Sequence, residues 1–94
     1  MENKVILKFK DDIIALAGFE YGEQIFANQI KGNIEYNKAF YIQFPDNIKI
    51  VASSFVQGLF SNIVKEIGLK LTLERAHIIS SNARLVKKIK DKLI

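Results

Sequence analysis

The chain has 94 residues, of which 49% are hydrophobic and 26% charged, and its formal net charge is +4. This length is enough for one compact domain and too short for two, so we expect a single domain over residues 1–94. The chain has no cysteine, which excludes a disulfide scaffold and a zinc site built on thiolates. We expect a cytoplasmic protein, because no apolar run approaches the about 20 residues of a membrane span and the first residues do not resemble a signal peptide.

The N-terminal part of the sequence predicts two strands and a helix. Residues 4–10 are rich in β-branched and aromatic side chains, residues 11–12 offer a turn, and residues 13–16 form a second apolar run. This pattern predicts a β-hairpin. Apolar residues at helical spacing then predict a helix over about residues 20–31, in which Gly22 indicates close packing.

The middle of the chain predicts a central strand. Residues 38–44 form a nearly continuous apolar run that Pro45 closes, and a short run of this kind is typical of a strand buried on both faces. Phe40, Tyr41 and Phe44 would also suit a platform on which nucleic-acid bases stack. We favour core packing for these aromatic side chains, because a strand this apolar is usually covered by helices.

Two serines join a short extended piece to an amphipathic helix. Residues 48–51 lead into Ser53 and Ser54, and apolar residues then recur at spacings of three and four towards Gly68. This spacing predicts a core-facing helix of about four turns that ends at Gly68. A serine hydroxyl at a helix start can accept a hydrogen bond from a free amide, so we expect one of the two serines to be the N-cap.

The C-terminal part offers two candidate segments for one strand and predicts a basic helix. Residues 69–73 alternate as an edge strand does, while residues 75–80 are the better candidate for a core strand. Ser81 or Asn82 then caps a final helix. Residues 82–94 hold five basic residues against one acidic residue, an excess equal to the net charge of the whole chain. The order of elements is ββαβαβα, which predicts an α/β domain with three helices and a mixed sheet that combines a hairpin with parallel core strands.

The junction Ala52-Ser53-Ser54-Phe55 enters the second predicted helix directly from an extended piece. In its position and in the order of the surrounding elements, it resembles the Asp-Ser-Ser-Gly motif of the STAS domain, the fold of bacterial anti-sigma-factor antagonists. The chain is more closely similar to the STAS-like family of unknown function, whose pattern Ile-Ser-x-Ser-Phe is approximated by Val51 and the four residues that follow. The resemblance covers nearly the whole chain and implies a small STAS-like domain.

The resemblance also implies a regulatory role. In the antagonists the first serine of the motif is phosphorylated by a partner kinase, and the unmodified helix surface binds that kinase. Carried over to this chain, Ser53 is the candidate phosphorylation site, and Ser54, Val56 and Gln57 lie near the partner-binding surface. The implied partner is a protein, either a histidine-kinase-like ATPase or a serine kinase.

Other chemistry is sparse in the sequence. His77 is the only histidine and lies in an apolar run, so we favour a core or strand-edge role over catalysis. We find no nucleophile elbow, P-loop or dinucleotide fingerprint, and we expect no enzyme activity, no metal and no cofactor. The alternative function is binding of nucleic acid or another anionic surface through Arg84, Lys87, Lys88 and Lys90 on the last helix.

Overall fold

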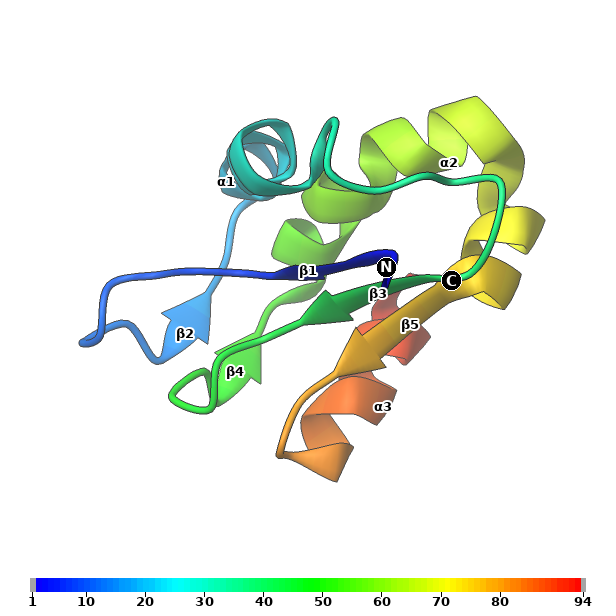
Figure 1. Ribbon diagram of the computed structural model, residues 1–94. Helices are drawn as coiled ribbons and strands as arrows, with labels where there is room; N and C mark the ends of the chain where they lie inside the picture. Colours follow the sequence, from blue (N-terminus) through cyan, green and yellow to red (C-terminus); the bar gives the residue numbers. More distant parts are fainter. Residues whose placement is uncertain (1, 94) are drawn as a thin grey trace.

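The computed structural model describes residues 2–93, which form two small sheets and three α-helices (Figure 1). The strands are β1 (Lys4–Ile6), β2 (Ala15–Leu16), β3 (Phe40–Gln43), β4 (Ile50–Val51) and β5 (Ala76–Ile79). The helices are α1 (Phe19–Ile25), which continues as a π-helical segment η1 (Phe26–Ile30), α2 (Ser53–Arg75) and α3 (Ala83–Lys92). The α/β class with parallel core strands and three helices is confirmed over this range.

The strand pairs of residues 2–93 are all parallel. One sheet has the order β1-β3-β5, and the other pairs β2 with β4. The central position of β3 confirms the prediction for residues 38–44. Parallel neighbours need a crossover connection, and here the connections that carry α1 and α2 pass over the same side of the strands (Figure 1).

The predicted β-hairpin of residues 4–16 is wrong, because β1 pairs with β3 and β2 pairs with β4. The amide of Leu7 extends the first pairing by donating to the carbonyl of Gln43 at 2.9 Å. The backbone between β1 and β2 is held by a distant side chain, since the Asn47 amide donates to the carbonyl of Ile13 at 2.8 Å. The turn expected at residues 11–12 is present, since the amide of Ile13 donates to the carbonyl of Lys10 at 3.0 Å, but it does not pair β1 with β2.

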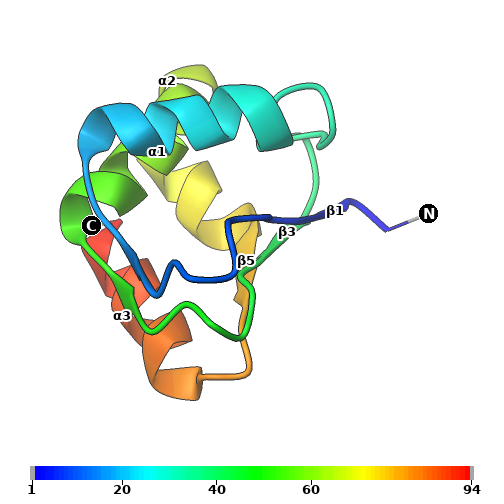
Figure 2. The same ribbon diagram turned by 90° about the vertical axis from the view of Figure 1, so that its left-hand side faces the viewer.

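The central strand is covered on one face only. Phe40 and Ile42 are fully buried, whereas Tyr41 is 37% exposed to solvent. Tyr41 stacks on His77 of β5, with ring centroids 4.8 Å apart. The prediction of burial on both faces is therefore wrong for Tyr41, because the described helices pack on the inner face and leave the outer face open (Figure 2). His77 lies half-buried on an edge strand, as expected.

Helices α1 and α2 cross at two glycines. A Cβ atom on Gly22 would lie 2.7 Å from the amide nitrogen of Leu59, and one on Gly58 would lie 2.8 Å from the carbonyl carbon of Phe19. Such distances leave no space for a side chain, so the two helix backbones touch. This confirms that Gly22 marks close packing, and it brings the N-terminal ends of α1 and α2 together.

Helix α2 bends at Gly68 and then continues to Arg75. Gly68 has φ 86° and ψ 160°, outside the helical region, and the helix resumes over residues 69–75. The Thr72 hydroxyl donates to the Gly68 carbonyl at 2.8 Å. The prediction that the first helical segment ends at Gly68, with this residue in the left-handed region, is confirmed. Residues 69–73 are helical rather than extended. The strand β5 falls within residues 75–80, the better of the two candidates.

Candidate functional site

Helix α2 begins without a serine cap. Its N-cap residue is Ala52, whose side chain makes no capping hydrogen bond. The Ser54 hydroxyl accepts a hydrogen bond from the amide of Gly18 at 3.0 Å, so it joins the start of α1 to the start of α2. The prediction of a serine N-cap is wrong because this contact between helices uses the hydroxyl. The first amides of α2 thus have no side-chain acceptor at the cap, and they present the positive end of the helix dipole.

The predicted partner-binding residues separate into exposed and buried ones. Ser53, Ser54 and Gln57 are exposed, and Ser53 and Gln57 share one face of α2 because they are four residues apart. Val56 is fully buried in the core. Its side chain therefore cannot reach a partner, and the other three residues remain as candidates.

Two large apolar side chains near these serines were missed by the sequence analysis. Phe19, the first residue of α1, is 44% exposed, and Ile50, three residues before Ser53, is 59% exposed. Phe19 stands at helical spacing with buried apolar residues, and Ile50 lies in a short apolar run. In neither case does the sequence alone distinguish an outward side chain from an inward one. We call Ser53, Ser54, Gln57, Phe19 and Ile50 the α2 N-terminal surface. It combines hydroxyl and amide groups with exposed apolar area, as many protein-binding surfaces do.

The basic residues of α3 lie on its outer side. Arg84, Lys87 and Lys88 are exposed, and Lys90 is half-buried. The helix is capped as predicted, since the Asn82 side chain accepts hydrogen bonds from the amides of Arg84 and Leu85. The Lys92 ammonium donates to the carbonyl of Val51, which ties the end of α3 to the strand that leads into α2.

Comparison with protein families identifies the chain. Residues 21–91 match the model of a family described as a STAS-like domain of unknown function, DUF4325. The chain belongs to this STAS-like family. Membership indicates a regulatory or protein-interaction module, a class that is generally non-catalytic. The searches of curated proteins and of solved structures found no match.

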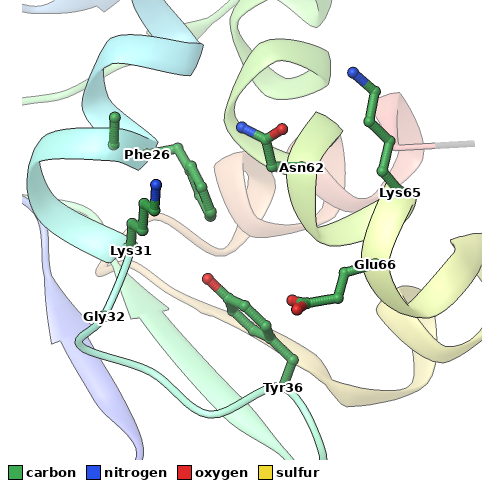
Figure 3. Close-up of a pocket in the computed structure, with 8 residues that line it drawn as sticks. Phe26, Lys31, Gly32, Tyr36, Asn62, Lys65 and Glu66 are labelled. Atoms are coloured by element: carbon green, nitrogen blue, oxygen red, sulfur yellow. The ribbon is translucent and has the colours of Figure 1, made fainter.

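The STAS-like domain also has an open groove between η1 and α2 (Figure 3). Its lining residues on α2 begin at Asn62, beyond the first turns of the helix. The volume of the groove is about 490 Å³. The groove is lined by side chains from three segments, namely Phe26, Ala27, Lys31, Gly32, Tyr36, Asn62, Lys65 and Glu66. No motif in the sequence had indicated this place, because its residues come from segments that are unremarkable when read separately.

Tyr36 stands at the base of the groove, with its ring beside the carboxylate of Glu66 (Figure 3). Its ring packs edge-on against Phe40 at a centroid distance of 5.7 Å. Burial raises the pKa of the Tyr36 hydroxyl above its usual 10.0, and the negative charge of Glu66 raises it further. The hydroxyl therefore remains a neutral hydrogen-bonding group at any physiological pH.

We expect Tyr36 to ionise late in an ultraviolet absorbance titration of the folded protein. The Tyr36→Phe variant should lack this late step, and Glu66→Gln should lower the pKa of Tyr36 only in part, because burial is the larger cause. In the unfolded chain Tyr36 ionises first, so its contribution to stability is present below pH about 10 and is lost as the pH rises through the folded-state pKa. A late step that persists in Tyr36→Phe would contradict its assignment to this buried hydroxyl.

Residues 2–93 hold neither a cluster of metal-ligating side chains nor a helix that could span a membrane. No group of three or more histidine, aspartate or glutamate side chains is placed there to hold a metal ion. None of the helices in this range is long and apolar enough to cross a membrane. His77 stacks on Tyr41 instead of facing a carboxylate in a cleft.

Proposed function

We propose that this STAS-like domain regulates a protein partner by binding it through the α2 N-terminal surface, with phosphorylation of Ser53 as the switch. The partner is a histidine-kinase-like ATPase or a serine kinase. The observation that carries the proposal is the exposed residue Ser53 in the first turn of α2. Exposed Ile50 lies three residues before it, and exposed Phe19 follows Gly18, whose amide binds the Ser54 hydroxyl. Helix α2 is anchored from behind by α1, so this surface is held rigid.

A phosphate on Ser53 would change the surface without changing the fold. The group carries about −1.5 to −2 charges near neutral pH and accepts hydrogen bonds strongly. At the start of α2 it meets amides that lack a side-chain cap and the positive end of the helix dipole, both of which stabilise it. The same charge would stand within the apolar part of the docking surface, where its desolvation opposes binding. Phosphorylation is therefore expected to release the partner while the domain stays folded.

The test compares partner binding by wild-type protein and by Ser53→Asp. Affinity capture from the native host should recover an ATPase or serine kinase with the wild-type domain, and the recovered partner should bind Ser53→Asp about tenfold more weakly. The matched control is Ser81→Asp, which adds the same charge at an exposed serine before α3 and should bind normally. Mass spectrometry of the native protein should find phosphate on Ser53. Equal binding by both variants, with Ser53 unmodified, would eliminate the switch.

The alternative function uses the basic side of α3. Arg84, Lys87 and Lys88 are exposed together there, which is what an anionic surface would require. A Lys87→Glu/Lys88→Glu variant separates the two functions in the same capture experiment. Loss of binding in this variant, with a steep dependence on salt and no effect of Ser53→Asp, would favour nucleic acid or another anionic surface over a protein partner.

A further inference from the structure

Strand β1 forms one edge of the larger sheet, and part of its backbone has no strand beside it. The order β1-β3-β5 places β3 on one side of β1, and within residues 2–93 no strand pairs with the other side (Figure 1). The Asn3 carbonyl and the Leu7 amide both bond to β3, each at 2.9 Å. Backbone groups of neighbouring residues point to opposite sides of an extended strand, so those of Lys4 and Ile6 point towards the open edge. Such an edge is a template for another strand.

The same edge is closed at Lys8 by a side chain. The Gln29 amide group donates to the Lys8 carbonyl at 2.8 Å and accepts from the Lys8 amide at 2.7 Å. These are the two bonds that a neighbouring strand would make, so the hydrogen bonding of an added strand ends before Lys8. The stretch from Lys4 to Ile6 is left open, and Ile6 is 52% exposed, so apolar surface accompanies its backbone groups.

We propose that a second copy of this chain occupies the open edge, with its β1 antiparallel to the first and Val5 on the two-fold axis. Two identical strands that pair in this way are related by a two-fold axis, the commonest symmetry of protein oligomers. Lys4 of each copy then lies opposite Ile6 of the other, and each of these pairs exchanges two backbone hydrogen bonds. The outer faces of the two sheets continue into one. The α2 N-terminal surface has no residue on β1, so the proposal is independent of the proposed function.

The charges on β1 and its flanks select this register. Side chains alternate between the two faces, so only shifts of two residues keep the outer faces together. With Val5 on the axis, Glu2 of each copy lies opposite Lys8 of the other. A shift of two residues in one direction places Lys4 opposite Lys4, and a shift in the other direction places Lys4 opposite Lys8. Opposite charges stabilise a cross-strand pair and like charges destabilise it, so both shifted registers are disfavoured.

A hollow beside the start of β1 suits the end of the second strand. Its volume is about 260 Å³, and it is lined by the residues just before β1 and by the loop that follows η1. Its charged side chains are Glu2, Glu35 and Lys38, of which Lys38 and Glu35 form an ion pair at 3.1 Å. Two acidic residues against one basic residue leave the hollow negative. Because Lys8 of the second copy lies opposite Glu2, the segment that reaches the hollow is residues 8–10, Lys-Phe-Lys, which is positive.

The interface is small, so the dimer is weak. Strand β1 has three residues, and their edge buries far less than the about 800 Å² per partner of a stable interface. We expect a transient dimer with a Kd of about 0.1–1 mM. It would form where a partner holds two copies of the domain side by side, and it would raise the affinity for such a partner through effective concentration.

Sedimentation equilibrium of the full chain at concentrations up to about 2 mM tests the proposal. The mean mass should rise above the monomer mass of 10.7 kDa as the concentration increases. Glu2→Lys and Lys8→Glu should each weaken association about fivefold, because each places like charges opposite one another. The double variant Glu2→Lys/Lys8→Glu exchanges the two charges and should restore association.

Matched controls separate charge pairing from a general effect of charge. Glu74→Lys and Lys70→Glu make the same changes of charge at exposed positions of α2, and they should associate as the wild-type protein does. Circular dichroism verifies that every variant folds.

Disulfide formation reports the register. The chain has no cysteine, so the Lys4→Cys and Ile6→Cys proteins each carry a single thiol. When the two are mixed in equal amounts and oxidised mildly, the mixed disulfide should form about fivefold faster than either symmetric one, because only positions 4 and 6 face each other at bonding distance.

Three results would overturn the proposal. The first is a chain that stays monomeric at about 2 mM. The second is a double charge variant that associates as weakly as the single ones. The third is a symmetric Lys4→Cys disulfide that forms as fast as the mixed one. If the chain stayed monomeric and Glu2→Lys lost capture of the protein partner, the open edge of β1 would belong to that partner instead.

Discussion

The Gly58→Ala variant is expected to lower the free energy of unfolding by about 3 kcal/mol, the upper end of the usual range for over-packing. In an ordinary helix interior the same change stabilises by up to about 1 kcal/mol, because alanine is the better helix former. The sign of the effect is therefore diagnostic. It reverses here because the added methyl group would collide with the carbonyl group of Phe19, whose carbon lies 2.8 Å from the new atom.

The collision cannot be relieved by a side-chain rotation. Its partner is the backbone of α1, so the two helices would have to separate and loosen the buried side chains between them. Separation would also stretch the hydrogen bond from Gly18 to Ser54, on which the rigidity of the α2 N-terminal surface depends. Gly22→Ala should act in the same direction, since its methyl group would lie 2.7 Å from the Leu59 amide nitrogen.

Urea unfolding followed by circular dichroism measures the effect. The control is Gln57→Ala, an exposed change at the neighbouring position of the same helix, which should alter stability by less than about 0.5 kcal/mol. If Gly58→Ala proved as stable as the wild-type protein or more so, the two helix backbones would not be in contact.

The sequence predicted those elements whose apolar side chains face a single direction. Helix α3 is the clearest case, with Leu85 and Ile89 buried, basic residues outward and Asn82 as its cap. The strand β3 was found because its short apolar run is bounded by Pro45. In both cases the local sequence pattern agrees with the final packing, so the element can be predicted from the sequence.

The errors arose where packing partners are distant in the sequence. Helix α2 is covered by α1 on one side and by the rest of the core on another, so its buried arc includes neighbouring positions such as Phe55 and Val56. For this reason Val56 is buried, although the resemblance to the antagonists had implied a place near the partner-binding surface. Tyr41 was misassigned in the opposite direction, because an apolar run does not tell whether a second layer of helices covers the sheet.

The groove between η1 and α2 could not be predicted from the sequence, because its residues come from segments that are distant along the chain. Lys31, Tyr36 and Glu66 are ordinary surface residues in their own segments, and only the return of the chain past α2 brings them together. The π-helical segment that forms one wall has no sequence signature of its own. The α2 N-terminal surface was easier, because Ser53 and Ser54 stand at a junction between two elements that the sequence itself marks.

The Phe55→Ala variant is expected to have the larger effect on stability, a loss of about 3–5 kcal/mol. Phe55 is fully buried, and its ring packs edge-on against Tyr21 at 5.5 Å and against Phe9 at 6.4 Å. It thus joins α2 to α1 and to the segment after β1. A loss of this size is a large part of the about 5–15 kcal/mol that stabilises a typical domain. Thermal and urea unfolding both measure it.

Comparison with Phe19→Ala separates the effect of burial from that of residue type, because both variants replace phenylalanine by alanine. Phe19→Ala removes the same side chain from a position that is 44% exposed, and it should cost less than about half as much. A double-mutant cycle with Tyr21→Leu should give a coupling of about 0.5–1.5 kcal/mol for the edge-on pair. Equal losses for Phe19→Ala and Phe55→Ala would contradict the placement of Phe55 in the core.

Position 55 is also where this chain differs from the antagonists that it resembles. Where their motif has glycine after the two serines, this chain has Phe55, and its ring fills space between α1 and α2. Phe55→Gly, which restores the glycine, should therefore destabilise at least as much as Phe55→Ala, with about 1 kcal/mol more from the loss of helix propensity. If Phe55→Gly were instead well tolerated, the serine junction would not depend on this anchor, and its resemblance to the antagonist motif would extend to the packing beneath it.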